Sequence, residues 1–231
     1  MTEFLGAVTV FLVAHLVPPM PSVRNRLVSW LGRGAYVAVY SLLSLGLLVW
    51  IILAARRAPY LALWYPAPWQ ALVPIAVMPL AGWLLLAGLM EHNPLSISMR
   101  VSATVEGVGP ATAVTRHPVL WASLLWALSY IPPNGDLVSI ILFGGMMALS
   151  LVGLFLVDRR VRRRFGEERW NQLAAQTSMV PLVALYTGRA RIRPSHRDII
   201  IAITAMTLYV WFLMIGHAAL IGPDPLAWMA W

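Results

Sequence analysis

Long apolar stretches without charged residues alternate along the chain with short segments that carry arginine. About 20 consecutive apolar residues are enough for a helix to cross the hydrocarbon core of a bilayer. The pattern therefore predicts an all-α fold, a polytopic transmembrane helix bundle that forms one domain over residues 1–231. We expect about six transmembrane helices, at residues 3–17, 34–55, 70–90, 116–131, 136–157 and 198–220.

The fourth predicted helix is the shortest, because the sequence Pro132-Pro133-Asn134-Gly135 forces a turn directly after it. Either this helix is short or it begins upstream, near Ala111. Glycine accepts the positive φ that a tight turn often requires. We therefore expect Asn134 and Gly135 to form a tight turn that holds the fourth and fifth helices as an antiparallel pair.

The composition is that of an integral membrane protein. Hydrophobic residues make up 60% of the chain and charged residues 11%, whereas an ordinary soluble domain has about 25% charged residues. The net charge of +8 comes from arginines between apolar segments. This arrangement favours membrane lipid as a partner and does not indicate nucleic-acid binding. The absence of cysteine excludes disulfides, thiolate metal sites and a cysteine nucleophile.

The arginines are distributed unevenly between the two sides of the predicted bundle. The loops after helices one, three and five hold 15 of the 17 arginines, and only Arg56 and Arg57 fall on the opposite side. Because positive residues gather in cytoplasmic loops, we expect both termini outside and residues 158–197 in the cytoplasm. The apolar first segment lacks a basic start and a clear cleavage site, which predicts a retained helix rather than a signal peptide.

An ionisable motif, Thr115-Arg116-His117-Pro118, stands at the start of the fourth predicted helix. Proline suits the first helical turn, which places His117 at the N-cap or just before it. The partial positive charge of a helix N-terminus disfavours a protonated imidazole, so His117 should keep a lone pair that can bind a metal. Arg116 offers a forked donor for a carboxylate or phosphate. The alternative is that Arg116 anchors the span and His117 only caps the helix.

Three histidines fall at the same predicted depth on three helices. His15 ends the first helix, His92 ends the third and His117 begins the fourth, all on the predicted cytoplasmic side. His196 precedes the sixth helix on that side, whereas His217 lies near the outer end. An ionisable residue within a membrane span indicates function. His15 has no polar neighbour in its own turn, so its ring requires either a backbone carbonyl or a metal.

Haem is the metal group that these residues suit. Carboxylates for a cage around a hard metal are scarce, since the nearby acids on that side are Glu91, Glu106 and Asp158. Two imidazoles among many aromatic residues suit haem iron, which has two axial positions. The side chains that could receive the haem propionates lie on the same predicted side; they are Arg24, Arg26, Arg100 and Arg116.

Short polar motifs are spread in order over almost the whole length of the chain. They are His15 with Pro18, Arg24, Arg26-Leu27, Tyr40-Ser41, Arg57-Ala58-Pro59, Asn93-Pro94, Thr115-Arg116-His117-Pro118, Leu120-Trp121, Leu125-Trp126, Asn134-Gly135-Asp136, Phe143-Gly144, Asp158-Arg159-Arg160, Thr177-Ser178 with Pro181, Gly188-Arg189, and His217 before Gly222 and Pro225.

Through these motifs together, the chain resembles the NnrU family of bacterial membrane proteins over almost its whole length. This resemblance implies a multi-pass protein of the bacterial inner membrane, and the arginine distribution predicts that both termini are periplasmic. The family takes its name from nitrogen-oxide metabolism, around nitrite and nitric oxide reduction in denitrification.

The NnrU family is also similar to the plant 15-cis-zeta-carotene isomerases, which are haem-b membrane enzymes. The similarity implies that His15 and His117 are the axial ligands of haem b. His92 is the spare candidate, because it lies at the same predicted depth. The Pro18-Pro19 sequence after His15 departs from the plant pattern.

Two activities follow from a bis-histidine haem. Loss of one ligand, on reduction or on nitric oxide binding, would open a coordination position. The protein would then be a redox-gated isomerase of a polyene such as a carotenoid, or a responder to nitric oxide. Its partner is accordingly a hydrophobic small molecule or nitric oxide, and whether it is an enzyme stays open.

Two alternatives have a different basis. Gly109-Pro110, Arg116-His117-Pro118 and Asp158 before Phe165-Gly166-Glu167 resemble the isoprenylcysteine carboxyl methyltransferases. That resemblance implies S-adenosylmethionine as the cofactor, although Trp170 stands where tyrosine is usual and Asp158 has a different spacing. In the second alternative, the arginines of residues 159–169 dock a respiratory reductase, and the protein is an assembly factor.

Overall fold

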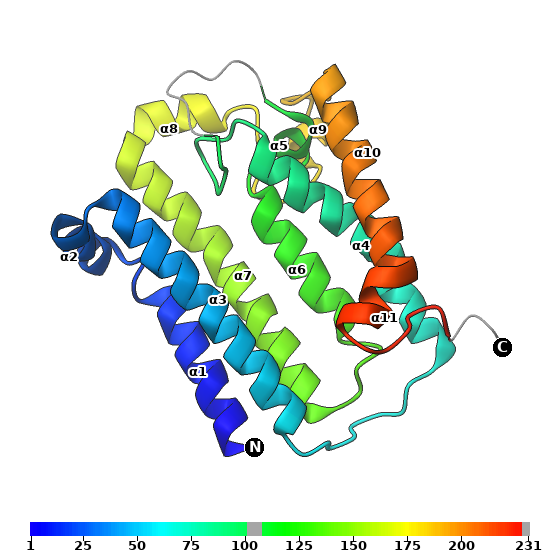
Figure 1. The fold of residues 1–231 in the computed structure, drawn as a ribbon. Helices are drawn as coiled ribbons and strands as arrows, with labels where there is room; N and C mark the ends of the chain where they lie inside the picture. Colours follow the sequence, from blue (N-terminus) through cyan, green and yellow to red (C-terminus); the bar gives the residue numbers. More distant parts are fainter. Residues whose placement is uncertain (101–107, 228–231) are drawn as a thin grey trace. The chain divides into compact units, whose positions relative to one another are not determined.

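The computed structural model describes residues 1–100 and 108–227, and its regular elements in these ranges are helices. This confirms the predicted all-α class (Figure 1). The helices in chain order are α1 Thr2–Leu16, α2 Pro21–Leu31, α3 Arg33–Arg57, α4 Pro68–Met90, α5 Pro110–Val114, α6 Pro118–Tyr130, α7 Leu137–Phe165, α8 Glu167–Ala174, α9 Val183–Tyr186 and α10 His196–Trp211, followed by the π-helical turn η1 Phe212–Gly216 and α11 His217–Leu220.

Four helical segments are long and apolar enough to cross a membrane: α3, α4, α7 and the run from His196 to Leu220. The pair α1 and α2, bent by 81°, makes a fifth if it counts as one span. The chain is therefore a polytopic membrane bundle with four to five candidate spans rather than about six. Which side of the membrane each terminus occupies stays a prediction, and Trp231 lies outside the described residues, as does Glu106.

Two predicted helices account for the difference in span number. The first predicted helix forms as α1, whose 15 residues make a candidate span only together with α2. The fourth predicted helix accounts for the rest. It forms as α6 but has only 13 residues, a rise of about 20 Å, whereas the hydrocarbon core is about 30 Å thick. A turn at residues 131–133 ends it. The upstream start near Ala111 is a separate short helix, α5, because Thr115 is extended between α5 and α6.

The helices fall into two compact units, and α7 contributes to both. Whether the chain acts as one domain stays a prediction. The first unit comprises Met1–Tyr65 and Asn134–Gly145. In it α1 and α2 pack on α3, and Phe4 and Ile51 are almost completely buried. The Tyr36 hydroxyl donates to the Pro18 carbonyl at 3.2 Å, which fixes the bend between α1 and α2.

Gly135 belongs to this first unit and holds the loop after α3. Its carbonyl accepts hydrogen bonds from the backbone N–H groups of Leu63 and Trp64, at 2.7 and 3.1 Å. A Cβ at position 135 would collide with the Trp64 carbonyl oxygen. The φ of Gly135 is not positive, so the predicted reason for this glycine was wrong. Close backbone approach, rather than turn conformation, requires it.

The second unit comprises Pro66–Pro133 and Met146–Trp231, with α4 packed against both α6 and α10. A Cβ on Gly88 would lie 2.7 Å from Pro118 Cγ, so the missing side chain lets α4 approach the start of α6. Pro79 lacks the N–H that would bond to the Ile75 carbonyl. The Tyr209 hydroxyl of α10 donates to that carbonyl at 2.7 Å, which satisfies it within an apolar helix.

The α6 helix also packs antiparallel to the part of α7 in this unit, as predicted. Ser150 Oγ donates to Ser123 Oγ at 3.1 Å. A Cβ on Gly153 would lie 3.2 Å from Leu120. The contacting pairs run in opposite order along the two helices, because Ser123 meets Ser150 and Leu120 meets Gly153. The start of α6 therefore lies beside the later part of α7.

Glu91 is the residue that follows α4, and its carboxylate binds the first backbone N–H groups of α5. Its carboxylate accepts from the N–H groups of Ala111 and Thr112, at 2.7 and 2.9 Å, and from the Thr112 hydroxyl at 2.8 Å. A Cβ on Gly109 would collide with this carboxylate. Burial raises the pKa of Glu91 above its ordinary value, and Asp198 adds to the rise, although the three hydrogen bonds oppose it. Glu91 thereby positions the segment that leads to Arg116.

We expect Gly135→Ala to reduce the melting temperature of the purified protein, because the new Cβ must displace the Trp64 backbone. The cost should be about 1–3 kcal/mol of unfolding free energy. Gly144→Ala is the matched control in the same unit, since a Cβ there meets nothing within 4 Å. Equal melting temperatures for the two variants would contradict the close approach at Gly135.

We also expect a pH dependence that comes from Glu91. A carboxyl group whose folded-state pKa is raised contributes stability fully below its unfolded value, about 4.3. That contribution is lost as the pH rises through the folded-state pKa. The stability advantage of the wild type over Glu91→Gln should therefore shrink from pH 4 to pH 8 in thermal melts. The exposed Glu168→Gln is the control, and parallel curves for the wild type and Glu91→Gln would count against the assignment.

Candidate functional site

His117 is the N-cap of α6 and Pro118 is its first residue, as the sequence predicted. The imidazole is completely buried, and each ring nitrogen has one partner. Nδ1 lies 2.9 Å from Ser96 Oγ, and Nε2 lies 3.2 Å from Asp158 Oδ1. A carboxylate can only accept, so Nε2 donates its proton to Asp158. In the neutral form of the ring, Nδ1 holds the lone pair and accepts from the Ser96 hydroxyl.

Arg116 binds the same carboxylate. Its Nη1 donates to Asp158 Oδ1 at 2.8 Å, and its Nε donates to Thr177 Oγ1 at 2.9 Å. The guanidinium also stacks on Trp170, 4.8 Å from the ring centroid. Arg116 therefore binds a carboxylate of the chain itself, through one guanidinium nitrogen. Its use for a cofactor stays a prediction.

The backbone of Arg116 is held as firmly as its side chain. Its N–H donates to the Ser178 carbonyl at 2.7 Å, and its carbonyl accepts from Asn93 Nδ2 at 2.9 Å. The hydroxyl of Thr115 and the indole N–H of Trp121 both donate to the Met179 carbonyl, at 3.1 and 2.9 Å. The loop after α8 thus closes over the motif and fixes the direction in which α6 begins.

Trp170 lies between two arginines. Arg162 stacks on its ring at 5.0 Å from the centroid, in addition to Arg116. The indole Nε1 is buried and has no hydrogen-bond partner among residues 1–100 and 108–227. A buried donor without an acceptor costs about 1–3 kcal/mol, so the ring is held here by stacking and apolar packing rather than by its N–H.

His15 lies in the first unit, on α1. Its Nδ1 donates to the Phe11 carbonyl at 2.8 Å, which leaves the lone pair on Nε2. The ring stacks on Phe11 with centroids 4.1 Å apart and meets Tyr40 edge-on at 6.0 Å. His15 therefore binds a backbone carbonyl, one of the two partners expected for it, and this hydrogen bond does not use Nε2. His15 and His117 belong to different units, so their convergence on one haem stays a prediction.

Four other predicted residues, Arg24, His92, Arg100 and His217, make no hydrogen bond, ion pair or ring contact with His117 in the part of the chain that the structure describes. Arg24 lies in the first unit and stacks over Tyr36 at 5.7 Å. His92 and Arg100 form an isolated bridge after α4. His217 stacks with Tyr130, at the opposite end of α6 from His117. That helix is about 20 Å long, so His217 is remote from the motif.

Four residues complete this site beyond the predicted ligands: Ser96, Asp158, Trp170 and Thr177. Asp158 was expected as a nearby acid, and Asp158 and Trp170 were grouped with Arg116 and His117 only in the methyltransferase-like pattern. Asp158 is the sole acid of α7, and an acid within a long apolar helix is the signal for its role. Thr177 and Trp170 lie in a polar segment of ordinary composition. Only folding brings them to Arg116.

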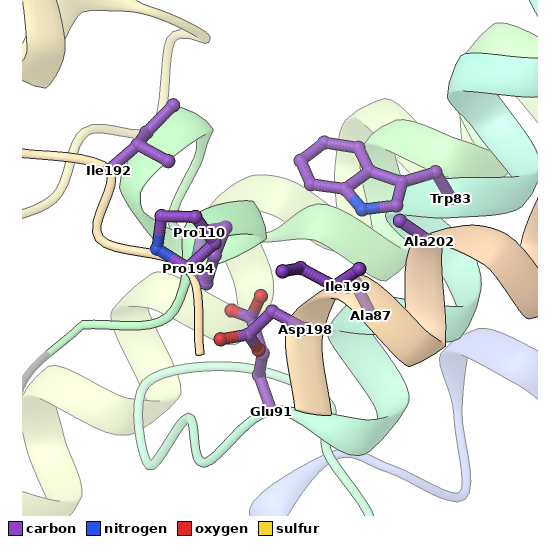
Figure 2. A pocket seen from close by; sticks show the side chains of 9 residues that line it. All are labelled: Trp83, Ala87, Glu91, Pro110, Ile192, Pro194, Asp198, Ile199 and Ala202. Carbon is purple, nitrogen blue, oxygen red and sulfur yellow. The ribbon is translucent and has the colours of Figure 1, made fainter. Parts of the chain in front are cut away.

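A cavity of about 200 Å³ lies beside this region, between α4 and α10 (Figure 2). Its walls include Trp83, Pro110 and Ile192, and the carboxylates of Glu91 and Asp198 lie close together at its edge. Both acids have structural partners, since Asp198 accepts from the N–H and hydroxyl of Ser195 at 2.8 and 2.6 Å. The described part of the chain holds no cluster of three or more acids and histidines arranged for a metal ion.

Comparison with known proteins identifies the family. The chain is 30% identical over 105 residues to the chloroplastic 15-cis-zeta-carotene isomerase of Arabidopsis thaliana and 30% identical over 104 residues to that of Zea mays. Each match covers 43% of this chain and 28% of the relative. No solved structure matches the chain. The family model described as NnrU protein matches residues 3–225, nearly the whole sequence, and the chain therefore belongs to the NnrU family.

Proposed function

We propose that this protein binds haem b through His15 and His117 and catalyses the cis–trans isomerisation of a hydrophobic polyene within the membrane. The buried, neutral His117, held through Nε2 by Asp158, carries the proposal. Metal-bound histidines commonly donate their other ring N–H to a carboxylate or a backbone carbonyl, which fixes the tautomer. The similarity to the 15-cis-zeta-carotene isomerases supports the substrate class.

The hydrogen bonds of the two histidines indicate which nitrogen of each ring would hold the iron. His15 donates through Nδ1 to a backbone carbonyl, so Nε2 is its ligating nitrogen. His117 donates through Nε2 to Asp158, so Nδ1 is its ligating nitrogen, and iron would replace one contact with Ser96. Both rings are therefore in tautomers that leave one lone pair for a metal.

The arginines divide into two roles in this proposal. Arg116 orients His117 by fixing Asp158, because one carboxylate oxygen joins both side chains. Arg24 and Arg100 are the candidates for the haem propionates, since neither has a carboxylate partner among the described residues. A guanidinium matches a carboxylate by two parallel hydrogen bonds.

The chemistry requires no consumed co-reactant, because isomerisation conserves every atom and electron of the polyene. Haem, held by His15 and His117, would supply a redox-active iron for this reaction. The apolar spans hold the polyene and exclude water. Asp158 keeps the proton of His117 on Nε2. Nitric oxide would bind the same iron, which would link the protein to nitrogen-oxide metabolism.

We expect the protein purified from haem-replete cells to show a low-spin spectrum with sharp reduced α and β bands. His117→Ala and His15→Ala should each lose haem or convert it to high spin. His217→Ala is the matched control, because His217 packs at the far end of α6, and it should leave the spectrum unchanged. The reduced protein should convert a cis polyene to its trans isomer, as followed by chromatography.

Different outcomes would contradict different parts of this proposal. A purified protein without a Soret band would overturn haem binding. Loss of the low-spin signal in His92→Ala, with His15→Ala unaffected, would replace His15 by His92 and keep the haem. A reduced protein that binds nitric oxide spectrally but leaves cis polyenes unchanged would reject isomerisation in favour of a nitric oxide responder.

A further inference from the structure

We infer that Arg159 and Arg163, at the end of α7, bind the phosphate headgroup of an anionic glycerophospholipid. This site is separate from the haem proposal and does not depend on it. It lies within the second unit, where α7 passes into α8 (Figure 1).

A groove at this junction has the size for a headgroup. It encloses about 500 Å³ and is lined by Arg159, Arg162, Arg163, Gly166 and Glu167. Gly166 has a φ of +77°, which a residue with a side chain rarely adopts. This glycine ends α7 and lets the chain turn directly into α8, which places Gly166 and Glu167 beside the arginines that end α7.

The charges in the groove are unbalanced. Arg162 is neutralised by Glu167, with Nε 2.7 Å from Oε1, and is held on the Trp170 ring. Arg159 and Arg163 pair with no carboxylate in residues 1–100 and 108–227. They are separated by one helical turn, where like charges destabilise a helix. A phosphate between them would remove this repulsion and accept forked hydrogen bonds from both guanidiniums.

The surface beside the groove favours a lipid over a free anion. Phe155 and Leu156, one turn before Arg159, are 64% and 47% exposed. On a helix, residues 155, 159 and 163 follow one another along a single face. This face is therefore apolar along the candidate span and carries two positive charges at its end. A phospholipid would place its acyl chains on Phe155 and Leu156 and its phosphate at the two arginines. Inorganic phosphate would contact only the arginines.

The test measures lipid binding by the full chain in neutral detergent. Phosphatidylglycerol should raise the melting temperature, whereas phosphatidylcholine and inorganic phosphate should not. The double variant Arg159→Gln/Arg163→Gln should weaken phosphatidylglycerol binding on the order of ten- to thirty-fold, since each basic residue near a membrane surface adds appreciable affinity for anionic lipid. Arg191→Gln/Arg193→Gln removes the same charge from an exposed segment of the same unit and should keep wild-type binding.

Three results would overturn the inference. Equal weakening in both double variants would show attraction by net charge and no site. A melting shift with inorganic phosphate as large as that with phosphatidylglycerol would show an anion site without lipid selectivity. Wild-type lipid binding by Arg159→Gln/Arg163→Gln would exclude these residues. If that variant is unstable in phosphatidylcholine, the single variant Arg163→Gln decides the question, and full retention of affinity would reject the site.

Discussion

The ion pair between Arg116 and Asp158 is the contact on which the rest of the site depends. It joins the start of α6 to the end of α7 at 2.8 Å, with little exposure of either side chain. Removing one partner of a buried pair leaves an uncompensated charge and costs about 3–5 kcal/mol. The two partners are therefore required together. Thr177, Trp170 and Asn93 contribute by fixing the position of Arg116.

This constraint determines what His117 can do. The carboxylate that neutralises Arg116 also accepts from His117 Nε2, so the ion pair sets the tautomer of a completely buried imidazole. The two hydrogen bonds of the ring, to Asp158 and Ser96, also resist its rotation. The same end of α7 continues beyond Asp158 with exposed arginines. One helix thus supports a buried polar site and an exposed cationic end.

The sequence predicted the local features well, because each depends on neighbours in the chain. Charge-free windows found every long helix, and Pro118 placed His117 at the N-cap. The contacts of Arg116 with Asp158 and Thr177 were not predicted, since these residues lie 42 and 61 residues away and no periodicity links them. Gly135 was predicted to matter for its turn conformation, whereas the structure requires it because a side chain there would collide with Trp64. That collision depends on the tertiary fold and could not be predicted from neighbouring residues. The convergence of His15 with His117 stays a prediction from family resemblance.

A double-mutant cycle on Arg116 and Asp158 would measure how strongly these two side chains depend on each other. Unfolding free energies would be measured in mixed micelles for the wild type, Arg116→Gln, Asp158→Asn and the double variant. We expect a coupling energy of about 2 kcal/mol or more, because the charge pair is close and largely desolvated. A coupling energy below about 0.5 kcal/mol, the level of independent sites, would show that the ion pair does not hold the site together.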